Sequence, residues 1–155
     1  MAQFPLRLEQ YFFTEIQVRA NPDFKPAGTL VGSHVDVRSN AGVIEDRTDH
    51  YFVDCVVSLD ETKSENPPYF FRVNAFGILN ASDPDLTDDV AKQHLVRSAG
   101  AQVLIGAIRE LVAELTSRGP WGVFVVPIIP IAPPMPTAPE PQPEGTGSIK
   151  PNQAE

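Results

Sequence analysis

Cysteine is nearly absent from this sequence, because Cys55 is the only one in 155 residues. A lone cysteine excludes an intramolecular disulfide and suits a reducing compartment, so we expect the protein in the cytoplasm. Basic residues are also scarce: 12 Lys and Arg stand against 20 Asp and Glu, which gives a net charge of -8. That charge repels phosphate backbones and anionic lipid headgroups, so we predict no nucleic-acid partner and no direct membrane contact.

Long apolar runs and catalytic groupings are missing as well. No stretch reaches the roughly 18 apolar residues of a membrane helix, and no signal peptide is expected at the N-terminus. His34, His50 and His94 lack the spacing of metal ligands, and no glycine-rich phosphate-binding pattern occurs. Cys55 falls on the apolar face of an expected strand, which favours a small core residue. We therefore predict no enzyme, no metal and no cofactor.

Proline is plentiful instead, and it marks a boundary. Residues 132–155, APPMPTAPEPQPEGTGSIKPNQAE, are rich in proline, polar and weakly acidic. Such a segment buries too little apolar surface to balance the entropy of ordering it. The composition predicts one folded domain over residues 1–131 and a disordered acidic tail over residues 132–155.

Four segments of the folded part have the composition of strands. They are QYFFTEIQVRA (10–20), SHVDVRSN (33–40), HYFVDCVVSLDE (50–61) and YFFRVNAFGIL (69–79). The second is expected to stop at the turn-forming SNAG, residues 39–42. Period-two alternation is clearest in 50–61, whose apolar face carries Tyr51, Val53, Cys55, Val57 and Leu59. Short connections between these segments predict an antiparallel sheet.

A long helix is predicted over residues 93–119. Leu104, Ile108, Leu111 and Leu115 recur at the spacing of one helical stripe, which Ile105 and Val112 widen. Gly119 and Pro120 end the helix. A shorter helical turn is expected within residues 85–95, with Thr87 or Asp85 as its cap.

The apolar run VFVVPII (123–129) follows directly after the only tryptophan. A buried strand is the ordinary interpretation of such a run. However, Pro120, Pro127 and Pro130 remove backbone donors at short intervals, so the run cannot be a central strand throughout. A crossing loop whose apolar side chains line a groove fits the prolines better.

These segments, in this order, resemble the SecB family of protein-export chaperones. The resemblance covers roughly residues 8–131 and rests on the following elements: YFFTEIQVRA, SHVDVRSN, YFVDCVVSL, a strand ending in FGIL, IRELVAELTSRG and VFVVPI. It implies an α+β fold, a four-stranded antiparallel sheet with a long helix packed on one face. It also implies an ATP-independent holdase that assembles as a dimer of dimers and binds non-native polypeptides in apolar grooves.

The resemblance and the strand patterns together nominate binding residues. Trp121, Phe124 and Ile128 are expected to line the client groove. On the outer sheet face, Phe52, Val56, Phe70, Phe76 and Ile78 need cover, which predicts a homo-oligomer, most simply a tetramer. Among them, Phe52, Phe76 and Ile78 are further candidates for client binding.

Departures from the family bear on its coupling to export. The family binds its motor, SecA, through acidic residues on the sheet and a basic tail. Glu15 and Glu65 keep the acidic character, Arg19 reverses it, and Lys150 is the only basic residue of the tail. We expect weak SecA contact, membrane contact only through that motor, and no lid helix, because prolines follow the crossing run. Export clients or a dedicated client such as an antitoxin both remain open, and so does a non-catalytic adaptor with one folded partner.

Overall fold

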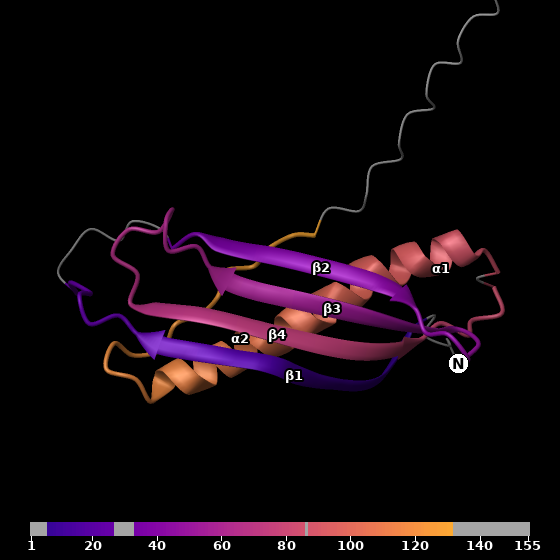
Figure 1. The fold of residues 1–155 in the computed structure, drawn as a ribbon, viewed down its shortest axis with the longest axis horizontal. Coiled ribbons are helices and arrows are strands. Elements are labelled where there is room, and N and C mark those ends of the chain that lie inside the picture. The colour runs from indigo at the N-terminus through magenta and orange to yellow at the C-terminus, as the bar shows by residue number, and fades with distance from the viewer. Residues whose placement is uncertain (1–5, 27–32, 86, 132–155) are drawn as a thin grey trace, which may run out of the picture.

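An antiparallel sheet carries a helical layer on one face (Figure 1). The computed structural model describes residues 6–26, 33–85 and 87–131. Its strands and helices are β1 (Arg7–Ala20), β2 (Val35–Val43), β3 (His50–Leu59), β4 (Tyr69–Asn80), α1 (Asp89–Leu95), a π-helical turn (Val96–Gly100) and α2 (Ala101–Ser117). The predicted α+β fold, with four antiparallel strands and a long helix on one face, is confirmed.

The strands lie in the order β1-β4-β3-β2. Three of them, β2 to β4, follow one another as a meander, and β1 pairs with β4 in the manner of a Greek key. The two edges of the sheet are therefore β1 and β2. Their pairing differs, because β1 shifts register twice, between Leu8 and Gln10 and between Phe13 and Glu15. The ladder of β2 with β3 has no shift over its length.

The expected turn at residues 39–42 is wrong, because β2 continues through it to Val43. Gly42 lies opposite Phe52 in the ladder, and a Cβ atom at position 42 would stand 2.6 Å from Phe52 Cε1. This glycine makes room for an aromatic ring rather than for a turn. The chain reverses later, where Asp46 and Asp49 take the positive φ angles of 68° and 57°.

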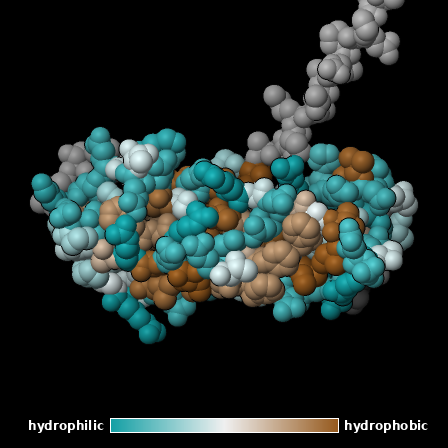
Figure 2. All heavy atoms as spheres, in the orientation of Figure 1, coloured by the Kyte–Doolittle hydropathy of each residue, from teal (hydrophilic) through white to brown (hydrophobic). Residues whose placement is uncertain are grey.

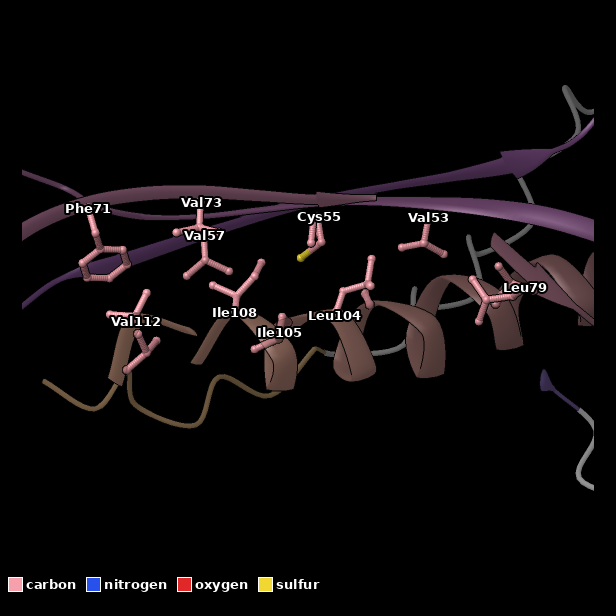
Figure 3. Packing of buried hydrophobic residues seen from close by; sticks show 14 of the residues in the cluster. Val53, Cys55, Val57, Phe71, Val73, Leu79, Leu104, Ile105, Ile108 and Val112 are labelled. Carbon is pink, nitrogen blue, oxygen red and sulfur yellow. The ribbon is translucent and has the colours of Figure 1, made fainter. Parts of the chain in front are cut away.

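The core lies between the sheet and α2 (Figure 3). The predicted apolar face of β3 is confirmed in full: Tyr51, Val53, Cys55, Val57 and Leu59 are all buried. Alternate residues of β4 complete the sheet side of the core. Gly100 lets the helix approach closely, since a Cβ there would lie 2.9 Å from Val53 Cγ2.

The helical layer differs from expectation at two points. The cap is Asp88 rather than Thr87 or Asp85, and its carboxylate accepts hydrogen bonds from the N–H groups of Val90 and Ala91. The buried stripe of α2 is also rotated from the predicted one. It consists of Ala101, Leu104, Ile105, Ile108, Val112 and Thr116, whereas Leu111 is half-buried and Leu115 exposed. Leu115 instead lines a hollow beside the edge strand β1.

Candidate functional site

An irregular stretch after α2, residues 118–131, crosses the helical side of the sheet beside α2; we call it the crossing segment (Figure 1). It forms neither a strand nor a helix. Two side chains of α2 hold its middle. Arg109 Nε donates to the carbonyl oxygen of Val126 at 2.8 Å, and Thr116 Oγ1 accepts from the N–H of Phe124 at 2.8 Å. The crossing segment is therefore fixed to the helix through its backbone.

The first turn of the crossing segment is held by Tyr69 of β4. Its hydroxyl accepts from the N–H of Trp121 at 3.0 Å and lies 2.9 Å from the carbonyl oxygen of Gly122, to which it donates. Trp121 Nε1 donates to the carbonyl oxygen of Asn21 at 3.0 Å, and the indole contacts the ring of Phe24 edge-on. These bonds tie the segment to residues that lie far away in the sequence.

Side chains of the crossing segment divide between the core and the surface. Val126 is fully buried, and the Phe124 ring packs on Phe71 with centroids 5.7 Å apart. Outward-facing Val123, Val125 and Ile128 are 59%, 60% and 81% exposed, respectively. Among the three predicted groove residues, Ile128 is thus the exposed one, whereas Trp121 and Phe124 are half-buried. Val123 and Val125 were not predicted as binding residues, because nothing in the apolar run 123–129 indicates which side chains face inward.

The outer face of the sheet carries a row of aromatic rings. The Phe12 ring lies 5.4 Å from that of Phe76, which stacks on Phe52 at 5.7 Å, and Phe52 covers Gly42. Ile78 stands opposite Phe52 in the ladder. Apolar residues form patches among polar ones on the face that Figure 2 shows.

The six predicted client-binding residues therefore form two surfaces. Phe52, Phe76 and Ile78 share the outer face, whereas Trp121, Phe124 and Ile128 belong to the crossing segment on the helical side. Phe12 was missed because two register shifts in β1 break the period-two pattern that would have assigned its side chain to a face.

The charged residues proposed to contact a motor are mostly paired. Glu15 accepts from Arg72 Nε at 3.1 Å and from Gln17 Nε2 at 2.9 Å. Arg19 binds Glu61 at 2.9 Å, and its guanidinium lies 4.4 Å from the centre of the Phe70 ring. Glu65 is exposed in the connection between β3 and β4.

In the described ranges, no three His, Cys, Asp or Glu side chains are placed to hold a metal ion. Burial, and secondarily the charge of Asp54, raises the pKa of the Cys55 thiol to about 11, so the thiol is protonated at neutral pH. None of the described helices has the length and apolar character needed to cross a membrane.

Comparisons with known proteins find no match to the sequence but do find similar solved structures. No family model matches the sequence, and no curated protein gives a significant match. Among solved structures, the chain is similar to the SecB-like chaperone of Mycobacterium tuberculosis, solved with a ChAD peptide from an antitoxin. The TM-score is 0.56 and the identity 16%, over 83% of this chain and 93% of that one. This chain has a SecB-like fold.

A second similar structure, a Streptococcus agalactiae protein of unknown function, has a TM-score of 0.40 and 12% identity, over 82% of this chain and all (100%) of that one. The SecB-like fold confirms the resemblance that the order of segments had indicated, for a divergent sequence. In this SecB-like fold, the crossing segment includes the run 123–129, for which the sequence had predicted a crossing loop rather than a buried strand.

Proposed function

We propose that this chain is an ATP-independent holdase that binds non-native polypeptides on the outward side of its crossing segment. One observation carries the proposal: Val123, Val125 and Ile128 expose most of their apolar surface on a backbone that side-chain hydrogen bonds hold in place. An apolar surface that cannot fold inward is available to any client. Aliphatic side chains also bind without demanding a particular sequence, as a holdase requires.

A similar solved structure bears on which polypeptides the chain would bind. The similar Mycobacterium tuberculosis protein was solved with a peptide from an antitoxin, which supports peptide-like segments as clients here. A dedicated antitoxin and general export substrates are the two client classes that we propose to test.

We further propose a homo-oligomer, most simply a tetramer. Phe12 is exposed at the end of the aromatic row, and Tyr11, Ile16 and Leu115 leave more apolar surface on and beside β1. Ile16 and Leu115 line one hollow beside β1, and contiguous exposed apolar surface often marks an interface between proteins. Light scattering at micromolar concentration should report several subunits, and a monomer would contradict the proposal.

Contact with SecA is proposed to be weak, and it would be the only route to a membrane. Arg72 already pairs with Glu15, and Arg19 stands where the family has an acidic residue. Of these three positions, Glu65 alone offers an exposed carboxylate without an ion pair to another described residue. Exposed charges of this kind act mainly on the rate of encounter and are screened by salt. The single cysteine supports a cytoplasmic location.

The test is suppression of aggregation of several unrelated unfolded proteins by the Val123→Ser, Val125→Ser double variant. Burying each half-exposed valine contributes about 1 kcal/mol, so client affinity should fall about 30-fold. A matched control replaces two valines of comparable exposure on the helices, Val90 at 60% and Val103 at 49%. It should hold clients as well as the native protein.

Two outcomes would contradict the proposal. Equal losses in both double variants would assign client binding to general surface hydrophobicity rather than to the crossing segment. Failure of the native protein to protect any unfolded client, with a single folded partner bound instead, would favour the adaptor.

A further inference from the structure

His50 lies at one end of the sheet, where the start of β1 meets the turn between β2 and β3 (Figure 1). Its ring nitrogen Nδ1 lies 2.6 Å from the carbonyl oxygen of Thr48. The other nitrogen, Nε2, lies 3.2 Å from Glu9 Oε1 and 3.3 Å from Asn80 Nδ2. The side chain of His50 is 14% exposed and that of Glu9 30%, so these contacts are partly shielded from water. Nε2 thus stands between an acceptor on β1 and a donor on β4.

The charge of the ring decides which contact Nε2 makes. The Thr48 carbonyl can only accept, so Nδ1 carries a hydrogen in either charge state. Asn80 Oδ1 accepts from the N–H of Ser82 at 3.0 Å, which orients the amide so that its NH2 group faces Nε2. In the neutral ring Nε2 accepts from Asn80, whereas in the protonated ring it donates to Glu9. The two bonds exclude each other, and each belongs to one charge state.

Charged side chains near His50 come from each neighbouring element. They are Arg7 and Glu9 on β1, Glu45, Asp46, Arg47 and Asp49 in the turn before β3, and Asp89 and Lys92 on α1. Asp49 pairs with Lys92, and Arg47 pairs with Glu9 Oε2 at 3.2 Å. Among the described residues, Glu9 is the only charged one that makes a hydrogen bond to the ring. Protonation of His50 therefore acts first on Glu9.

Glu9 is the extra residue of the first bulge of β1, because Leu8 and Gln10 pair with consecutive residues of β4. Arg47 holds this carboxylate from a side chain that is 48% exposed, and exposed ion pairs contribute little and are screened by salt. A bond from protonated His50 adds a better shielded anchor that crosses β4 and reaches β3. The exposed rings of Tyr11 and Phe12 follow the bulge on the same strand. The attachment of this sheet edge therefore depends on the charge of His50.

We propose that His50 is a proton-dependent switch, which ties the β1 bulge to β3 when protonated and binds Asn80 instead when neutral. Histidine ordinarily changes its charge between about pH 5 and 8, so the switch responds to mild acidification. Nε2 keeps one hydrogen bond in each state, so the proton redirects a contact rather than adding one. This inference is independent of the proposed holdase function, since it concerns only how the sheet holds its edge strand.

Two double-mutant cycles test the switch by urea titration at about pH 5.5 and about pH 8, at one protein concentration. The first combines Glu9→Ala with His50→Phe, and the second combines Asn80→Ala with His50→Phe. We expect the coupling between positions 9 and 50 to change the unfolding equilibrium constant about fivefold at the lower pH and less than about twofold at the higher one. The coupling between positions 50 and 80 should show the reverse dependence on pH.

A matched control cycle uses the ion pair of Arg19 and Glu61 at the opposite end of the sheet, whose side chains lie 2.9 Å apart. Because no histidine takes part in that pair, the coupling between Arg19→Ala and Glu61→Ala should be equal at the two pH values. A histidine that only packs at the end of the sheet does not change partners with pH. Failure of either His50 cycle to show its expected dependence would therefore overturn the proposal.

Nuclear magnetic resonance of the isotope-labelled native protein tests the same exchange of partners without any substitution. As the pH falls, the side-chain amide protons of Asn80 should shift in step with the ring of His50, because they lose their acceptor. They should not follow the rings of His34 and His94, which are exposed. Asn80 signals that stay constant while the His50 ring takes up its proton would contradict the switch, even if a variant of the cycles failed to fold.

Discussion

Replacing Tyr69 by phenylalanine tests whether one hydroxyl holds the crossing segment in place. This hydroxyl accepts from the Trp121 N–H, and its single hydrogen is shared between the carbonyl oxygens of Gly122, at 2.9 Å, and Thr116, at 3.2 Å. Tyr69→Phe therefore removes about two net hydrogen bonds, each worth roughly 0.5–1.5 kcal/mol. We expect the free energy of unfolding to fall by about 2 kcal/mol.

The sole tryptophan makes the effect visible at the site itself, because Trp121 begins the crossing segment. In urea titrations of the variant, tryptophan fluorescence should change at lower denaturant than the far-ultraviolet circular dichroism does. Tyr51→Phe is the matched control, a buried tyrosine of β3 whose hydroxyl makes no hydrogen bond to any described residue. A loss below about 0.5 kcal/mol in Tyr69→Phe, or an equal loss in the control, would refute the anchoring role.

Two further predictions concern a pair of apolar side chains that differ in exposure and a carboxylate with a lowered pKa. Replacing a fully buried phenylalanine by alanine costs about 3–5 kcal/mol, so Phe124→Ala at this half-buried position should lower the free energy of unfolding by about 2–3 kcal/mol. Ile128→Ala, at an 81% exposed position, should change it little in the same urea titration. Hydrogen bonds from Thr62 and Lys63 lower the pKa of Asp60 from 3.8 to about 2. Because the folded pKa of Asp60 lies below the unfolded one, the ionised carboxylate stabilises the fold at pH values above 3.8. The native protein should therefore lose its advantage in free energy of unfolding over Asp60→Asn as the pH falls from 3.8 to about 2.

Local pattern was sufficient for the central elements of the fold. Alternation in β3 identified every buried residue of its inner face and placed Cys55 in the core, because the strand period of two is exact wherever pairing is regular. The spacing of prolines 120, 127 and 130 also excluded a central strand after the helix, since proline cannot donate to a ladder. The tail expected over residues 132–155 lies outside the described residues and stays a prediction.

Contacts with residues distant in the sequence decided which apolar side chains face outward. Whether Phe124 or Val125 faces inward depends on Arg109, Thr116 and Tyr69, whose bonds to the crossing segment set the rotation of its backbone. The outward position of Phe12 likewise depends on register shifts that arise only when β1 pairs with β4. Composition and period therefore determined which residues are apolar and which elements they form. Tertiary contacts alone decided which of those residues remain exposed, because exposure is a property of what packs against a side chain rather than of the side chain itself.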